Sequence, residues 1–152
     1  SGPCLIGRTY NIAEKPKILY VAEPWKVHNV ADLIALKIVD TYPMGGTLPS
    51  SYSNFSTCSA DDASVKIGDK VTVLGYPGIG GSTITLTEGV VSGKLNDFWK
   101  TSAKIDHGNS GGIALTEKGC MLGVPTATIV GSSESLGLIM SVKAVMQMLS
   151  AL

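Results

Sequence analysis

The sequence predicts an all-β fold, a barrel or a sandwich of short antiparallel strands that ends in one helix. Several short segments alternate apolar and polar residues with a period of two, which is typical of strands with one buried face. The 18 glycines and seven prolines can form the tight turns between such strands. The 152 residues are 44% apolar and 16% charged, with a mean hydropathy of +0.26, so the chain can bury a core.

The expected elements follow one another along the chain. Residues 82–93 alternate Thr with Ile, Leu and Val, and we expect them to form a pair of half-buried strands. Residues 142–149 are apolar at 142, 145, 146 and 149, which is the spacing of one helical face. Residues 40–62 are rich in Pro, Gly, Ser and Asn, and we expect a long connection there. The other strands are expected at residues 17–21, 33–39, 71–75, 120–130 and 136–141.

The three cysteines are Cys4, Cys58 and Cys120. An odd count without Cys-x-x-Cys spacing argues against a disulfide framework and against a zinc site. Buried or free thiols are the favoured interpretation, and one disulfide with one spare thiol stays open.

The charge pattern excludes several classes of function. The chain has 12 Lys and Arg residues and 12 Asp and Glu residues, so its formal net charge is zero. No basic stripe indicates nucleic-acid binding. No apolar run reaches membrane-spanning length, and no signal-peptide pattern opens the sequence. The sequence has neither a phosphate-binding glycine loop nor a cluster of metal ligands, so we expect no cofactor and no metal.

Residues 108–112 read Gly-Asn-Ser-Gly-Gly, a pattern suited to a nucleophilic serine. A serine hydroxyl needs a base to become a nucleophile, and the oxyanion that it forms needs preorganised donors. Glycine at position 108 lets the N–H groups of Gly108 and Ser110 converge on one point, while Gly111 and Gly112 keep bulk away from the hydroxyl. A glycine-rich hairpin turn without chemistry is the alternative.

Around this motif the sequence resembles the trypsin-like serine peptidases of chymotrypsin fold, and among them the bacterial HtrA-type branch. The resemblance covers about three quarters of the chain in the order of the family, and several ordered segments are more specific than one pentapeptide. The matching segments are Ala31–Ile38 (Ala-Asp-Leu-Ile-Ala-Leu-Lys-Ile), Ile67–Val71 with Leu74–Pro77, Thr87–Gly93, Thr101–Ser110, Gly123–Ala127 and Leu138–Val142.

The resemblance implies two antiparallel β-barrels with the active site between them. It implies that residues 1–62 are a remnant of the first barrel with the connection between barrels. Residues 63–152 would then form the second barrel and the C-terminal helix. It also implies Ser110 as nucleophile, Asp32 as the buried carboxylate that orients a histidine, and an oxyanion hole at Gly108 and Asn109 that uses the N–H groups of Gly108 and Ser110. Asn109 stands where trypsin has an aspartate that pairs with a new N-terminus, so we expect no activation of that kind.

Substrate contacts follow from the same resemblance. A peptide or protein substrate is expected to pair with Thr126, Ala127 and Thr128 by strand addition. Lys104 and Ile105 lie in the sequence where the first specificity pocket is built. An inward Lys104 would favour an acidic substrate side chain, but an outward Lys104, paired locally with Asp106, is the favoured interpretation.

The catalytic histidine is not found. Counting back from Asp32 by the spacing of the family reaches the first residue or passes it. His28 and His107 are the two histidines of the chain, and both lack the sequence context of the family. Each is kept as a candidate for the base.

The first barrel is therefore expected to lack its opening strands. Unpaired edges and an exposed apolar wall would favour a homo-oligomer, or binding of a missing N-terminal segment. Three functions stay open: a serine endopeptidase seen as a fragment, a protease-like module that binds peptides without cutting them, and an assembly protein that reuses the barrel.

Overall fold

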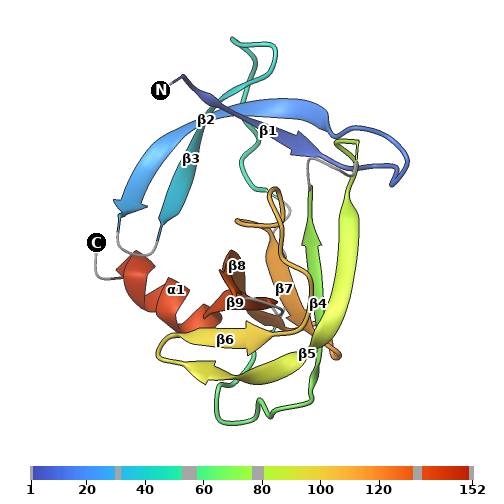
Figure 1. Cartoon of the computed structure of the whole chain (residues 1–152). Coiled ribbons are helices and arrows are strands. Elements are labelled where there is room, and N and C mark those ends of the chain that lie inside the picture. Colours follow the sequence, from blue (N-terminus) through green and yellow to red (C-terminus); the bar gives the residue numbers. More distant parts are fainter. Residues whose placement is uncertain (1, 30–31, 53–57, 77–80, 132–134, 151–152) are drawn as a thin grey trace. The chain divides into compact units, whose positions relative to one another are not determined.

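The computed structural model describes residues 2–29, 32–52, 58–76, 81–131 and 135–150. Parts of the expected segments, among them 53–57, Ala31 and Pro77, lie outside these residues. The chain divides into two compact units, residues 1–55 and 56–151, which are described separately (Figure 1).

The first unit is an open antiparallel sheet in the order β1-β2-β3. Its strands are β1 (Cys4–Arg8), β2 (Lys17–His28) and β3 (Leu33–Thr41). The strand expected at 17–21 continues to His28, because Pro24 lies at a bulge where the register with β3 shifts. The buried apolar residues of this sheet are Val21 and Ala22, which is too few for an independent core.

One face of this sheet carries exposed apolar side chains. Val27 lies opposite Ile34 in the register, so the two share a face, and Leu36 follows Ile34 by two residues. Their exposed fractions are 50%, 56% and 40%. The first unit thus presents the apolar wall that the sequence predicts.

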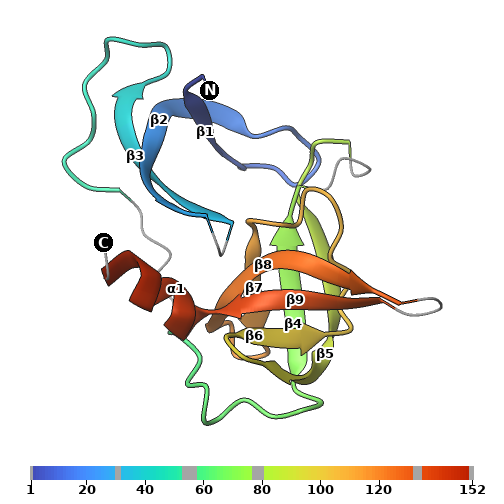
Figure 2. The same cartoon turned by 60° about the vertical axis from the view of Figure 1, so that its left-hand side comes forward.

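The second unit is a closed barrel in the strand order β4-β5-β6-β9-β8-β7 (Figure 2). Val71 and Val73 of β4 alternate with half-exposed residues and point into the core, which Trp99, Leu122 and Ile139 complete. The strands are β4 (Lys70–Gly75), β5 (Thr85–Leu95), β6 (Phe98–Thr101), β7 (Ile113–Thr116), β8 (Met121–Val130) and β9 (Ser135–Ser141).

The expected pair of strands at 82–93 is wrong, because β5 is one strand. A Cβ on Gly89, inside this strand, would overlap the backbone of Ala103. This glycine therefore serves the close approach of two chain segments and not a reversal of direction. The short strands β1, β6 and β7 were not predicted.

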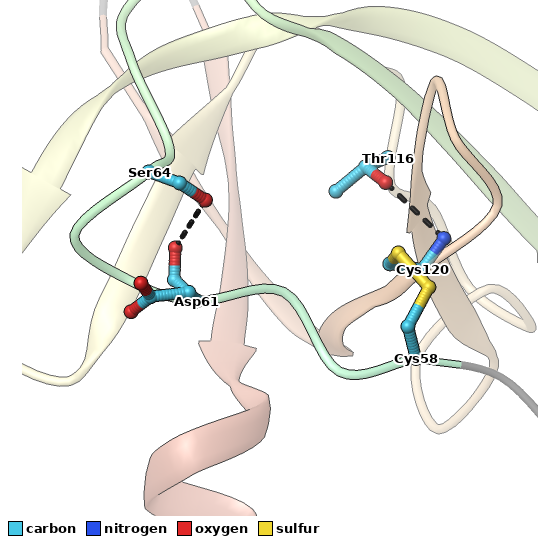
Figure 3. Close-up of a disulfide and its surroundings, with 5 residues drawn as sticks. All are labelled: Cys58, Asp61, Ser64, Thr116 and Cys120. Atoms are coloured by element: carbon cyan, nitrogen blue, oxygen red, sulfur yellow. Dashed lines mark hydrogen bonds between the residues drawn. A yellow bond between two sulfur atoms is a disulfide. The ribbon is translucent and has the colours of Figure 1, made fainter.

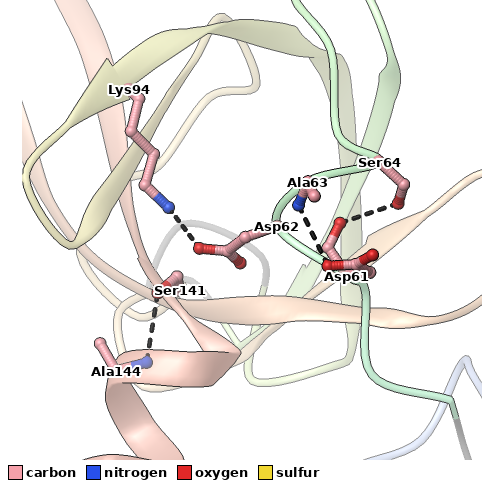
Figure 4. Close-up of polar contacts among 7 residues, drawn as sticks. All are labelled: Asp61, Asp62, Ala63, Ser64, Lys94, Ser141 and Ala144. Atoms are coloured by element: carbon pink, nitrogen blue, oxygen red, sulfur yellow. Dashed lines mark hydrogen bonds and ion pairs between the residues drawn. The ribbon is translucent and has the colours of Figure 1, made fainter.

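The helix α1 (Val142–Ser150) follows β9 directly, as expected. Ser141 caps it, since its Oγ accepts a hydrogen bond from the Ala144 N–H at 3.2 Å (Figure 4). Val142 and Met148 are its buried residues. Among the described residues, no helix has the length and apolar character needed to cross a bilayer.

Cys58 and Cys120 form a disulfide, and Cys4 is free (Figure 3). The favoured interpretation of three unpaired thiols is wrong, and the alternative of one disulfide with one spare thiol holds. The two cysteines are 62 residues apart in sequence, and a short parallel bridge between Ser59 and Met121 brings them together. No local pattern can reveal such a pairing.

The segment that precedes β4 is attached to the barrel at further points. The Ala60 N–H donates to the Met121 carbonyl at 2.8 Å, and the Met121 N–H donates to the Cys58 carbonyl at 2.7 Å. Asp62 pairs with Lys94 at 2.7 Å (Figure 4). The disulfide, the bridge and the ion pair together fix residues 58–62 on the second unit.

Candidate active site

Ser110 lies on a turn between β6 and β7, and hydrogen bonds hold this turn to the barrel. The Tyr76 N–H, at the end of β4, donates to the Gly108 carbonyl at 3.0 Å. The Gly111 N–H donates to the Pro125 carbonyl of β8 at 2.8 Å. The residues on both sides of Ser110 are therefore fixed to two strands, while Ser110 itself is exposed.

Two glycines allow the backbone of this turn. Gly108 has a φ of +102° and Gly111 a φ of +80°, values that side chains with a Cβ rarely adopt. The sequence predicts a conformational role for Gly108, whereas the unusual φ of Gly111 was not predicted.

Two N–H groups of the turn are candidates for stabilising an oxyanion. Among the hydrogen bonds of the described residues, none uses the N–H of Gly108 or of Ser110 as donor. The Asn109 N–H is already bonded to the Asp106 carbonyl at 3.0 Å. The expected contribution of Asn109 to the oxyanion hole is therefore corrected: its N–H is not available, and Gly108 and Ser110 stay the predicted donors.

Lys104 points to solvent. Its side chain is 72% exposed and lies 4.0 Å from the Asp106 carboxylate, which is the favoured outward arrangement. The Asp106 carboxylate also accepts the His107 N–H at 2.8 Å, and His107 is exposed. The charged groups of this loop thus lie on its outer side.

Ile105 belongs to the buried apolar core of the barrel. It is 6% exposed and lies against Gly137 of β9, where a Cβ would be 2.6 Å from the Ile105 Cδ1. The Thr128 hydroxyl donates to the Ile105 carbonyl at 2.7 Å. The structure therefore brings Ile105 and Thr128 of the expected substrate residues together.

The expected substrate strand is the second half of β8. β7 pairs with β8 at residues 121–123, whereas β9 pairs with β8 as far as Val130. Past residue 123, the Gly111 bond to Pro125 is the one backbone hydrogen bond between the described residues on the β7 side of β8. Thr126, Ala127 and Thr128, the residues expected to pair with a substrate, lie on this stretch.

Asp32 and His28 belong to the first unit and flank its β2–β3 turn. Asp32 has a φ of +51° and is exposed, whereas we expected its carboxylate to be buried from the sequence. A hairpin turn at the end of a three-stranded sheet has no neighbouring strand of its own unit to cover it. His28 is half-buried at the last position of β2, opposite Leu33.

Sequence reasoning missed the contributions of Gly137, Pro125 and Tyr76. A glycine inside a strand pattern was the available signal for Gly137, since it indicates a close approach. The Pro125 carbonyl and the Tyr76 N–H act through the backbone, which side-chain patterns do not reveal.

The charges of the barrel lie mainly on its surface. The hydrogen bond and the charge of Glu88 raise the pKa of the exposed Lys70 on the neighbouring strand. The described residues contain no group of three or more His, Cys, Asp or Glu side chains placed to hold a metal ion.

Comparison with protein families gives the affiliation of the chain. The sequence model of the trypsin-like peptidase domain matches residues 8–124, which is more than half of the chain. The chain belongs to the trypsin-like peptidase family.

Curated relatives of this trypsin-like chain are described as probable periplasmic serine endoproteases, DegP-like. That of Rhizobium meliloti is 31% identical over 122 residues, covering 74% of this chain and 22% of the relative. That of Brucella suis is 38% identical over 87 residues, covering 51% and 16%. The chain thus spans about a fifth of the length of these relatives or less.

A solved structure supports the same branch. The HtrA-type protease AlgW, determined with a decapeptide, matches 89% of this chain and 41% of its own, with a TM-score of 0.67 and 26% identity. The trypsin-like chain therefore has an HtrA-type fold, with one closed barrel and a partial sheet for the other.

Proposed function

We propose that this chain carries the nucleophile of a trypsin-like serine endopeptidase, with Ser110 as nucleophile and Asp32 as the acid that orients a histidine. The observation that supports it most is the turn at Ser110, which leaves the hydroxyl exposed beside two unused N–H groups. A barrel does not need such a turn in order to fold.

In the proposed reaction the Ser110 Oγ attacks the scissile carbonyl carbon and a base takes its proton. The carbonyl oxygen becomes an oxyanion between the N–H groups of Gly108 and Ser110. The tetrahedral intermediate collapses to an acyl-enzyme when the base returns the proton to the leaving amine, and water then releases the acid. The substrate backbone would pair with residues 126–128.

The base is proposed to come with a segment that completes the first unit. The exposed face of Val27, Ile34 and Leu36, and the outer edges of β1 and β3, offer an apolar surface and backbone groups for further strands. A segment that supplies the missing histidine, or a second copy of the chain, would cover them.

Labelling with a peptidyl phosphonate tests this proposal. Because no histidine is assigned as base, we expect slow labelling that Ser110→Ala abolishes, with a rate that rises about tenfold per pH unit between pH 6 and 9 as hydroxide replaces the base. Mass spectrometry after timed incubation measures the rate, and circular dichroism checks that both proteins are folded.

The other outcomes distinguish the alternatives. A rate that levels off above neutral pH, and that His28→Ala or His107→Ala lowers, would assign that histidine as base. A folded chain without labelling, but with peptide-induced NMR shifts at residues 126–128, would sink the enzyme proposal. It would favour the peptide-binding module, which the missing histidine already supports.

A further inference from the structure

Asn109 is an almost fully enclosed polar residue beside the nucleophile, with 1% of its surface exposed. Its N–H donates to the Asp106 carbonyl at 3.0 Å, and its carbonyl accepts the Gly112 N–H at 3.0 Å. Its side-chain Nδ2 donates to the Lys104 carbonyl at 3.3 Å. One residue thus joins the chain before Ser110 to the chain after it.

The side chain of Asn109 also fits closely against β4. A Cβ on Gly75 would lie 2.6 Å from the Asn109 Oδ1 and 2.8 Å from its Cα. This closeness leaves no room for a larger residue at position 75, and it fixes the carboxamide against the end of the strand.

The Asn109 Oδ1 is buried and accepts no hydrogen bond from the described residues. The charged groups of the loop do not enclose it: Lys104 and Asp106 pair on the outer side, with side chains 72% and 43% exposed, and His107 is exposed. Burying a neutral oxygen without a hydrogen bond costs some free energy of folding, whereas burying an unpaired charge costs far more.

We propose that Asn109 is a positioning residue whose neutral carboxamide holds the turn so that the N–H groups of Gly108 and Ser110 face the same point. It acts on the oxyanion through the backbone and does not touch it. This inference rests on the proposed function, since the turn matters for catalysis only if Ser110 reacts.

The variant Asn109→Asp tests the requirement for neutrality. In its protonated form the introduced carboxyl can donate to the Lys104 carbonyl as the amide does, but in its ionised form it cannot. Burial without a partner raises the pKa of this carboxyl above its ordinary value of about 3.9. A raised folded pKa means that the folded state binds the proton more tightly, so the native turn is kept at low pH and lost as pH rises through that pKa.

Backbone NMR between pH 3 and pH 8 gives the readout. We expect the amide signals of residues 108–112 in Asn109→Asp to match the wild type at low pH and to depart from it in one titration step. The wild type, recorded over the same pH range, supplies the background from the rest of the chain. Asn96→Asp makes the same change at an exposed turn and is expected to show no step at residues 108–112.

A second variant keeps the inference falsifiable if Asn109→Asp unfolds at neutral pH. Asn109→Ala at pH 7 should raise amide exchange at Gly111 and Gly112 by about tenfold or more, while the amides of Val71 and Val73 stay protected. Unchanged exchange at the turn, or the same titration in both aspartate variants, would overturn the inference. These signals do not depend on activity, so failed phosphonate labelling of the wild type would overturn the proposed function alone.

Discussion

Replacing Cys58 and Cys120 together by serine is expected to lower the free energy of unfolding of the barrel by about 4 kcal/mol. The disulfide closes a loop of 62 residues, which contains β4 to β7, and so restricts the unfolded chain strongly. Urea unfolding measures the loss through the fluorescence of Trp99, which is 5% exposed in the barrel core. A Trp25→Phe background removes the other tryptophan, which is 60% exposed in the first unit.

Two controls separate the effect of losing the crosslink from the effect of the serine substitutions on stability. Cys4→Ser changes the free thiol of the first unit and should leave the Trp99 transition unchanged. Wild-type protein treated with a dithiol reductant should lose as much stability as the double variant. A loss below about 1 kcal/mol in both would mean that the hydrogen bonds at residues 58–60 hold this segment without the crosslink.

The parts of the fold that follow from local chemistry were predictable. Val71 and Val73 alternate with half-exposed neighbours, and the helix at Val142 follows from apolar spacing, so these elements have signals within a few residues. The short strand at Phe98–Thr101 has too few residues for a period to be recognised. The expected pair of strands at 82–93 was wrong, and the glycine signal within it is ambiguous. A glycine in a strand serves either a turn or a close approach, and at Gly89 only the neighbouring Ala103 decides between them.

The candidate site also has some features that the sequence predicts and others that it cannot reveal. The glycines around Ser110 indicated the turn, because unusual φ values restrict the residue type. The bond of the Asn109 N–H to Asp106 could not be predicted, since it involves backbone atoms that every residue has. The disulfide likewise depends on two segments that meet only in the folded barrel.

Substituting Gly112 by alanine is expected to cost about 3 kcal/mol or more, although φ at this position is not in the left-handed region. A Cβ there would overlap the Leu74 carbonyl oxygen and lie 2.9 Å from the Asn109 carbonyl oxygen. Leu74 pairs with Ile113 in the β4–β7 ladder, so its carbonyl cannot move away without breaking strand pairing next to the nucleophile. The variant should therefore lose both barrel stability and any labelling of Ser110.

Gly119→Ala is the matched control for this clash. Gly119 has a φ of +77° in the β7–β8 turn, and a Cβ there would meet no atom within 4 Å. Only backbone strain should oppose this substitution, at about 1–2 kcal/mol, and labelling should be kept. If urea unfolding gave Gly112→Ala a loss no larger than that of Gly119→Ala, β4 would be able to yield at Leu74. The inference that β4 holds the nucleophile turn rigidly would then be wrong.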